Sequence, residues 1–90
     1  MNEIRRTIEI TNKRGLHARA SAKFVTLAST LPVSVEVEKE GSSVCGTSIM
    51  GLMMLGAAKG DTIVISANGD GAEAAVEALA ALVEARFNEE

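Results

Sequence analysis

The segment Gly15-Leu16-His17-Ala18-Arg19-Ala20 marks the point at which the hydrophobic pattern of the chain changes from strand-like to helical. Before this segment, residues 3–10 place their isoleucines on one face, and only Arg6 breaks the alternation, which predicts a strand with one wet face. After it, apolar side chains recur at helical spacing, which predicts a helix that begins near His17 and that Pro32 ends. The apolar stripe of this helix consists of Ala20, Phe24, Leu27, Ala28 and Leu31.

The rest of the chain continues the same two patterns in shorter pieces. Residues 39–42 and 68–71 have the composition of turns. Thr47 or Ser48 is placed to cap a short helix, and Asp70 is placed to accept a hydrogen bond at the start of the last helix. The predicted elements are strands over 33–38, 43–45 and 61–67, a short helix through 52–55 that Gly56 ends, and a last helix with its apolar stripe over 72–83.

The order strand, helix, strand, strand, helix, strand, helix predicts an α+β fold. Each predicted strand has one apolar face, and each long helix has one apolar stripe. All of these surfaces are buried if the helices pack on one face of a four-stranded, mainly antiparallel sheet. A chain of 90 residues is expected to form one domain, residues 1–90, with the other face of the sheet wet.

Composition excludes several classes of function. Nine basic residues against twelve acidic ones give a net charge of −3, which argues against nucleic-acid binding. The lone Cys45 cannot form an internal disulfide, which fits a reducing cytoplasm. The start of the chain does not have the pattern of a signal peptide, and the longest apolar run, 49–58, is far below the ~20 residues that span a bilayer. We expect a cytoplasmic protein without membrane insertion.

His17 is the only histidine, and it lies at a predicted helix start. Unpaired amides and the helix dipole favour an anion there, and Arg14 and Arg19 add positive charge. An exposed neutral imidazole is a good phosphoryl acceptor near pH 7. No metal-ligand set or catalytic triad accompanies it in the sequence. The residues alone leave three hypotheses: a phosphoryl carrier, a regulatory module in which His17 and Arg19 bind an anion, and an interaction domain without chemistry.

Two motifs resemble those of the HPr family, the histidine-containing carriers of the phosphoenolpyruvate-dependent phosphotransferase system. Residues 15–20 are similar to the active-site loop of that family. Residues 47–56, Thr-Ser-Ile-Met-Gly-Leu-Met-Met-Leu-Gly, are similar to its second signature, and the spacing, the segment order and the length also match. The resemblance implies a single HPr-like domain with an open-faced β-sandwich fold.

The resemblance also implies a function and a set of partners. His17 would be phosphorylated on Nδ1 by the phosphoenolpyruvate-dependent first enzyme, and the group would pass to a downstream acceptor protein, sugar-specific or regulatory. Such a protein is a stoichiometric carrier rather than an enzyme, and we expect it to be a monomer without a cofactor. Residues 48–51 look like the sugar branch, whereas 52–60 look like the nitrogen-related regulatory branch, which leaves the branch open.

Further roles carry over to individual positions. Arg19 would position the phosphoryl group, and Ser48 would be a regulatory site for a serine kinase and phosphorylase. The predicted phosphate environment is Arg14, Gly15 and Ala18, and the predicted docking residues are Ile49, Met50 and Met53. The chain departs from the usual pattern at Ala20, where the family has proline, and at Lys13 and Arg14, where many members have a small polar residue.

Overall fold

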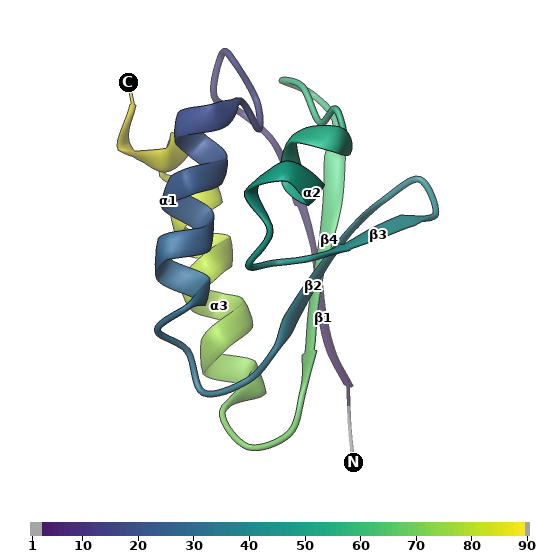
Figure 1. Ribbon diagram of the computed structural model, residues 1–90, viewed down its shortest axis with the longest axis vertical. Helices are drawn as coiled ribbons and strands as arrows, with labels where there is room; N and C mark the ends of the chain where they lie inside the picture. The colour runs from purple at the N-terminus through teal and green to yellow at the C-terminus, as the bar shows by residue number, and fades with distance from the viewer. Residues whose placement is uncertain (1–2, 90) are drawn as a thin grey trace.

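The computed structural model describes residues 3–89, so Met1, Asn2 and Glu90, which the predicted domain 1–90 includes, lie outside the described residues. Within 3–89, four strands form one sheet in the order β1-β4-β2-β3, and every neighbouring pair is antiparallel. The helices pack on one face of this sheet (Figure 1). The strands are β1 (Glu3–Glu9), β2 (Val35–Lys39), β3 (Ser42–Cys45) and β4 (Thr62–Asn68), and the helices are α1 (Ala18–Ala28), α2 (Ile49–Met54) and α3 (Ala72–Glu84). The predicted order of elements is therefore confirmed.

Arg6, which breaks the apolar alternation of β1, faces the helical layer together with Ile4 and Ile8. Its guanidinium donates to Glu77 at 2.6 Å and to Glu84 at 3.2 Å, and both carboxylates belong to α3. Its side chain is 35% exposed, so the charge stays in contact with water at the margin of the layer. The residue that breaks the apolar pattern of β1 therefore connects this strand to α3 by ion pairs.

The core lies between the sheet and the helices and contains both aromatic residues of the chain. Phe24 of α1 and Phe87, which follows α3, are fully buried, while aliphatic side chains fill the rest. None of the helices within residues 3–89 is long and apolar enough to cross a membrane. Tight packing of this small core fixes the relative positions of the helix ends, and the start of α1 is one of them.

Two local boundaries differ from their predictions. The first helix ends at Ala28 and not at Leu31, because the chain tightens into turns before Pro32, whose ring disfavours helical geometry in the residue before it. The second strand begins at Val35 and not at residue 33. The predicted hairpin turn over 39–42 is confirmed: Glu40 and Gly41 are its two central residues and connect β2 to β3, and both have positive φ as a type I′ turn requires.

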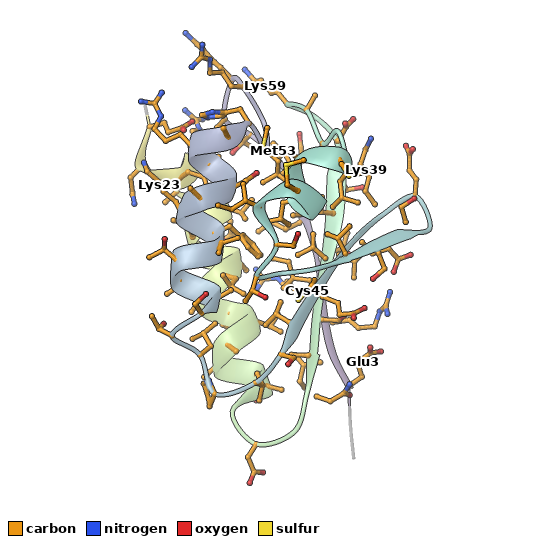
Figure 2. All side chains as sticks on the ribbon, in the orientation of Figure 1. Glu3, Lys23, Lys39, Cys45, Met53 and Lys59 are labelled. Carbon is orange, nitrogen blue, oxygen red and sulfur yellow. The ribbon has the colours of Figure 1, made fainter. Side chains whose placement is uncertain are left out.

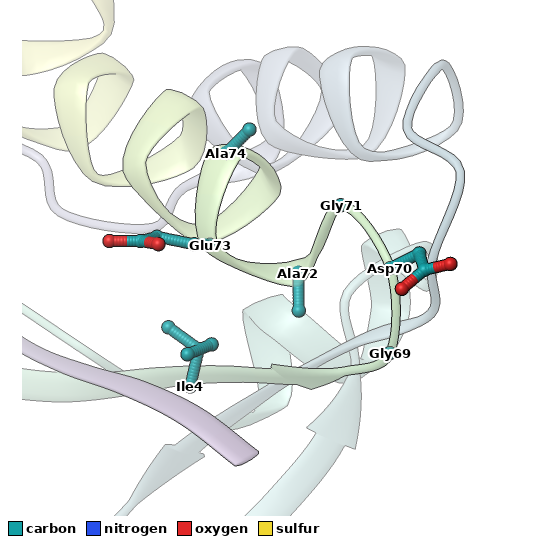
Figure 3. Close-up of a pocket in the computed structure, with 7 residues that line it drawn as sticks. All are labelled: Ile4, Gly69, Asp70, Gly71, Ala72, Glu73 and Ala74. Atoms are coloured by element: carbon teal, nitrogen blue, oxygen red, sulfur yellow. The ribbon is translucent and has the colours of Figure 1, made fainter. Parts of the chain in front are cut away.

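The start of α3 also differs from its prediction. Gly71, with φ of 88°, occupies the cap position, and no side chain caps this helix, so the expected Asp70 cap is wrong. Figure 3 shows the Asp70 carboxylate on the outer side of the turn, beside a shallow hollow of about 340 Å³ that Ile4 and residues 69–74 line. The turn that leads into α3 lies at the end of the molecule opposite to the start of α1 (Figure 1).

Candidate functional site

His17 is the cap residue of α1, but its side chain does not perform the capping. Its backbone is extended, with φ of −74° and ψ of −179°, and its carbonyl accepts the first helical hydrogen bond from the Ser21 amide at 2.9 Å. The imidazole makes no cap hydrogen bond. Residues 18–20 carry the first amides of the helix, which have no carbonyl partner within it. The ring is therefore available for other chemistry at the positive end of a helix dipole.

The loop before His17 is fastened on several sides. Gly15 has a φ of 62°, and a Cβ at that position would lie 2.2 Å from the Ala57 carbonyl oxygen. The Leu16 amide donates to the same oxygen at 2.9 Å. The Asn12 side-chain amide donates to the Gly15 carbonyl at 2.9 Å. These contacts hold the loop against residues 57 and 58 and give His17 a fixed position.

The C-terminal segment reaches His17 from the far end of the sequence. Nε2 of His17 lies 2.7 Å from Oε2 of Glu89. The other carboxylate oxygen accepts from the Asn12 side chain at 3.2 Å, and Nε of Arg19 lies 3.8 Å from Oε2. The side chains of His17 and Glu89 are only 20% and 12% exposed. The predicted open exposure of His17 is therefore wrong, because Glu89 covers one edge of the ring.

The environment of Glu89 favours its ionised form. Burial by itself would raise the pKa of the carboxyl, but hydrogen bonds with His17 and Asn12, followed by the positive charges of the protonated imidazole and of Arg19, outweigh it and lower the pKa below its ordinary value. A carboxyl whose pKa is lower in the folded state stabilises that state above its ordinary pKa. This contribution disappears as the pH falls through the lowered value.

Of the predicted phosphate environment, Arg14 lines a surface hollow near the start of α1, whereas Gly15 and Ala18 do not. Lys13, Arg14 and Arg19 line a hollow of about 310 Å³ together with Glu89, so the basic residues near the helix start face a common solvent-accessible volume. Gly15 shapes the loop, and Ala18 is the first residue of the helix. An anion in this hollow would meet two guanidinium groups and an ammonium group, and it would also meet the ionised Glu89 carboxylate, which would repel it.

Ser48 is the cap residue of α2, which resolves the choice between Thr47 and Ser48. Its Oγ accepts from the Gly51 amide at 2.9 Å. The helix packs against α1 and lies in the same half of the molecule as the start of α1 (Figure 1).

The three predicted docking side chains are all exposed, and the structure adds Met54, which the sequence analysis did not propose. The exposed fractions are 40% for Ile49, 68% for Met50, 41% for Met53 and 80% for Met54.

Sequence reasoning missed Asn12 and Glu89. Lys23 donates to the Phe87 carbonyl at 2.6 Å and so ties α1 to the C-terminal segment (Figure 2). Asn12 is fully buried and joins the loop to that segment. No sequence pattern signals the partnership of Glu89 with His17, which are 72 positions apart. Within residues 3–89, no cluster of three or more His, Cys, Asp or Glu side chains could hold a metal ion.

Comparison with known proteins matches nearly the whole chain. A family model described as PTS HPr component phosphorylation site matches residues 4–85. The phosphocarrier protein HPr of Neisseria meningitidis serogroup A is 49% identical over 86 residues, which cover 96% of this chain and 97% of that protein. The phosphocarrier protein NPr of Shewanella violacea is 38% identical over 89 residues, which cover 99% of this chain and 98% of that protein.

Solved structures agree with this result. The crystal structure of HPr-C-His from Thermoanaerobacter tengcongensis matches with a TM-score of 0.89 and 48% identity, covering 100% of this chain and 99% of that chain. A crystal structure of an HPr dimer from the same organism matches with a TM-score of 0.76 and 47% identity, covering 99% and 100%. The open-faced α+β sandwich predicted from the sequence is therefore also the fold of these proteins.

Proposed function

The chain belongs to the HPr family of phosphocarrier proteins of the phosphotransferase system, and we propose that it carries its phosphoryl group on His17. In this proposal the phosphoenolpyruvate-dependent first enzyme donates the group, and a downstream protein or domain accepts it. The protein is then a stoichiometric intermediate, and each partner supplies the rest of an active site around the imidazole.

One observation carries this assignment. His17 is the only histidine, it stands at the start of α1, and its partner Glu89 lines a hollow together with Lys13, Arg14 and Arg19. A phosphoryl group on the ring would be stabilised by the first amides of the helix and by these cations, at little cost in reorganisation. The loop fastened to residues 57 and 58 keeps the ring in place for each partner.

The docking surface that we propose is the exposed apolar side of α2. It consists of Ile49, Met50, Met53 and Met54, of which Met53 is labelled in Figure 2. Methionine side chains repack easily, so one surface can accommodate partners of different shape. A carrier that visits partners in turn must keep this surface free, and we therefore propose that the working form is a monomer, although a relative crystallised as a dimer.

The acceptor that we propose belongs to one of two branches. HPr and NPr both occur among the relatives, so sugar-specific and nitrogen-related regulatory acceptors are both candidates. Incubation of the phosphorylated protein with one purified acceptor from each branch, followed by the loss of the phosphoryl group from this chain, would identify the preferred one.

The direct test is a phosphorylation assay with phosphoenolpyruvate and an active first enzyme. We expect the intact mass to rise by one phosphoryl group, and we expect this group to be lost in acid, because phosphoramidates are acid-labile. A protein that gains no mass beside an HPr that does would contradict the proposal, and the site would then be an anion site without covalent chemistry.

Arg19 is expected to accelerate phosphoryl acceptance. A charge-assisted hydrogen bond contributes about 1.5–3 kcal/mol, so Arg19→Gln should slow acceptance roughly ten- to a hundredfold. Arg14→Gln removes a charge of the same kind from the same hollow but from the loop before Gly15, and it should slow acceptance less. Single-turnover rates for the three proteins test this. Equal slowing would mean that the net charge of the hollow matters and not the position of Arg19.

Ser48 is the regulatory site that we propose, with a serine kinase and phosphorylase as the enzymes. Its hydroxyl lies at the edge of the docking surface, so a phosphate there would bring a charge of roughly −1.5 to −2 next to Ile49 and Met50. The charge would have to be desolvated on docking, and it would repel an acidic partner. The helix itself would tolerate it, because a negative charge at a helix start is favourable.

Two substitutions of Ser48 separate charge from capping. Asp and Asn both cap helices well, so neither should cost much stability. Ser48→Asp is expected to weaken binding of the first enzyme roughly tenfold, which is about 1.4 kcal/mol, whereas Ser48→Asn should leave it nearly unchanged. Titration calorimetry measures both. Equal affinities of the Asp and Asn variants would remove the electrostatic explanation.

A further inference from the structure

The contact between Glu89 and His17 decides where the proton of the neutral imidazole lies. An ionised carboxylate can only accept hydrogen bonds, so a carboxylate oxygen 2.7 Å from Nε2 requires a proton on Nε2. A neutral imidazole carries only one such proton. Nδ1 then holds the free lone pair, which is what a nucleophile toward phosphorus needs.

The segment that brings Glu89 to this position is fixed on several sides. Arg86, Phe87 and Asn88 form a single left-handed turn with φ values of 57°, 54° and 60°, a conformation that residues other than glycine rarely adopt. The fully buried ring of Phe87 anchors this turn in the core, and Lys23 of α1 donates to its carbonyl at 2.6 Å. The fold therefore maintains an unfavourable backbone whose effect is to place Glu89 on His17.

The Asn12 side chain completes the arrangement. It donates through the same amide nitrogen to the Gly15 carbonyl and to Oε1 of Glu89, so the loop that positions His17 and the segment that positions Glu89 share one buried residue. Both partners are acceptors, which fixes the orientation of the amide. Asn12 thus helps to hold the Glu89 carboxylate and the His17 imidazole in fixed positions relative to each other.

We propose that Glu89 is a positioning residue for phosphoryl transfer: its carboxylate holds the proton on Nε2 of His17 and so assigns the attack on phosphorus to Nδ1. The inference rests on the proposed function of His17 and adds to it a residue from the other end of the chain. The protonated Nε2 faces Glu89, and the nucleophilic nitrogen is the other one.

The same contact balances the charge during the reaction. On acceptance, the lone pair of Nδ1 forms a bond to phosphorus, and the bond from phosphorus to the donor breaks with its electron pair leaving on the donor. The proton stays on Nε2, so the ring becomes cationic and Glu89 offsets its charge. On transfer, the bond between phosphorus and Nδ1 breaks, the pair returns to Nδ1, and the leaving group is a neutral imidazole.

A purely structural role would make Glu89 a fastening for the C-terminal segment. Such a role predicts that any loosening of the segment slows the reaction and that the imidazole itself is indifferent to Glu89. Lys23→Met provides the matched control, because it removes another tie of the same segment without touching the ring. Glu89→Gln removes the charge and keeps the length of the side chain.

The experiment measures two quantities on the full chain. The ¹⁵N shifts of the His17 ring in its neutral form should show a proton almost entirely on Nε2 in the wild type and in Lys23→Met, and a shift toward a mixture of tautomers in Glu89→Gln and Glu89→Ala. The single-turnover rate of phosphoryl acceptance should fall about tenfold in Glu89→Gln and less than twofold in Lys23→Met.

Unchanged ring shifts in both Glu89 variants would overturn the inference, as would equal slowing by Lys23→Met and Glu89→Gln. Failure of the proposed function looks different. If the wild type accepts no phosphoryl group, the ring shifts of the unmodified protein still report whether Glu89 sets the tautomer.

Discussion

Replacing His17 by alanine is expected to abolish phosphoryl acceptance from the first enzyme. The chain has no second histidine, so no other imidazole can take over. Removal of a covalent nucleophile eliminates the reaction path, whereas the loss of a positioning group only slows it. Intact mass after incubation with phosphoenolpyruvate and the first enzyme should remain that of the unmodified chain.

A second variant shows that the loss comes from the nucleophile and not from the fold. The imidazole of His17 does not cap α1, so its removal leaves the helix start intact, but it also removes the contact with Glu89. His17→Gln retains an amide that can donate to Glu89 while lacking the ring. Both variants should show the wild-type circular dichroism spectrum and no acid-labile phosphate. Acid-labile phosphate in either one would place the carrier site elsewhere in the chain.

The hydrophobic pattern predicted the fold because each element here is buried on one side only. Period-two and period-3.6 patterns survive wherever a strand or helix has a wet face, and the four strands and three helices all do within residues 3–89. The boundaries were less predictable. The turn before Pro32 and the cap of α3 at Gly71 depend on local backbone geometry that hydrophobicity does not encode.

The site was predictable as far as neighbouring residues build it. His17, Arg19 and Ser48 are each placed by the helix that they begin, and the two motifs mark those starts. The contact with Glu89 depends instead on where a left-handed turn leaves the chain after α3, and Phe87 sets that turn by packing. Partners that meet through tertiary packing alone leave no periodic signal in the sequence.

The departure at Ala20 has a simple structural result. Alanine replaces a proline that would fix φ at the helix start, yet α1 begins at Ala18 and Ala20 is fully buried. A strong helix former that fits the core is sufficient here. The geometry of the helix start is set by the loop, and above all by Gly15.

Gly15→Ala is accordingly expected to cause the largest loss of stability among the substitutions considered. Because Gly15 has a φ of 62°, placing a residue with a Cβ there destabilises the folded state by about 1–2 kcal/mol through backbone strain alone. The new Cβ would also lie 2.2 Å from the Ala57 carbonyl oxygen and 2.8 Å from the Ala58 Cα, both backbone atoms. The loop must move, and the hydrogen bond from Leu16 to Ala57 is lost with it. The free energy of unfolding should fall by at least about 3 kcal/mol.

Gly56→Ala is the matched control, because Gly56 has a nearly identical φ of 65° and a Cβ there would meet nothing within 4 Å. Gly56→Ala should lower the free energy of unfolding by only about 1–2 kcal/mol, which is the cost of a left-handed backbone for a residue with a Cβ. It should leave phosphoryl acceptance unchanged. Urea unfolding measures the loss of stability in each variant. The difference between the two losses is the cost of the steric clash of a Cβ at position 15 with residues 57 and 58. Gly15→Ala should also slow acceptance, since the displaced loop carries His17. Equal destabilisation by both variants would mean that the loop yields easily, and the rigid placement of His17 would then have to come from Asn12 and Glu89 instead.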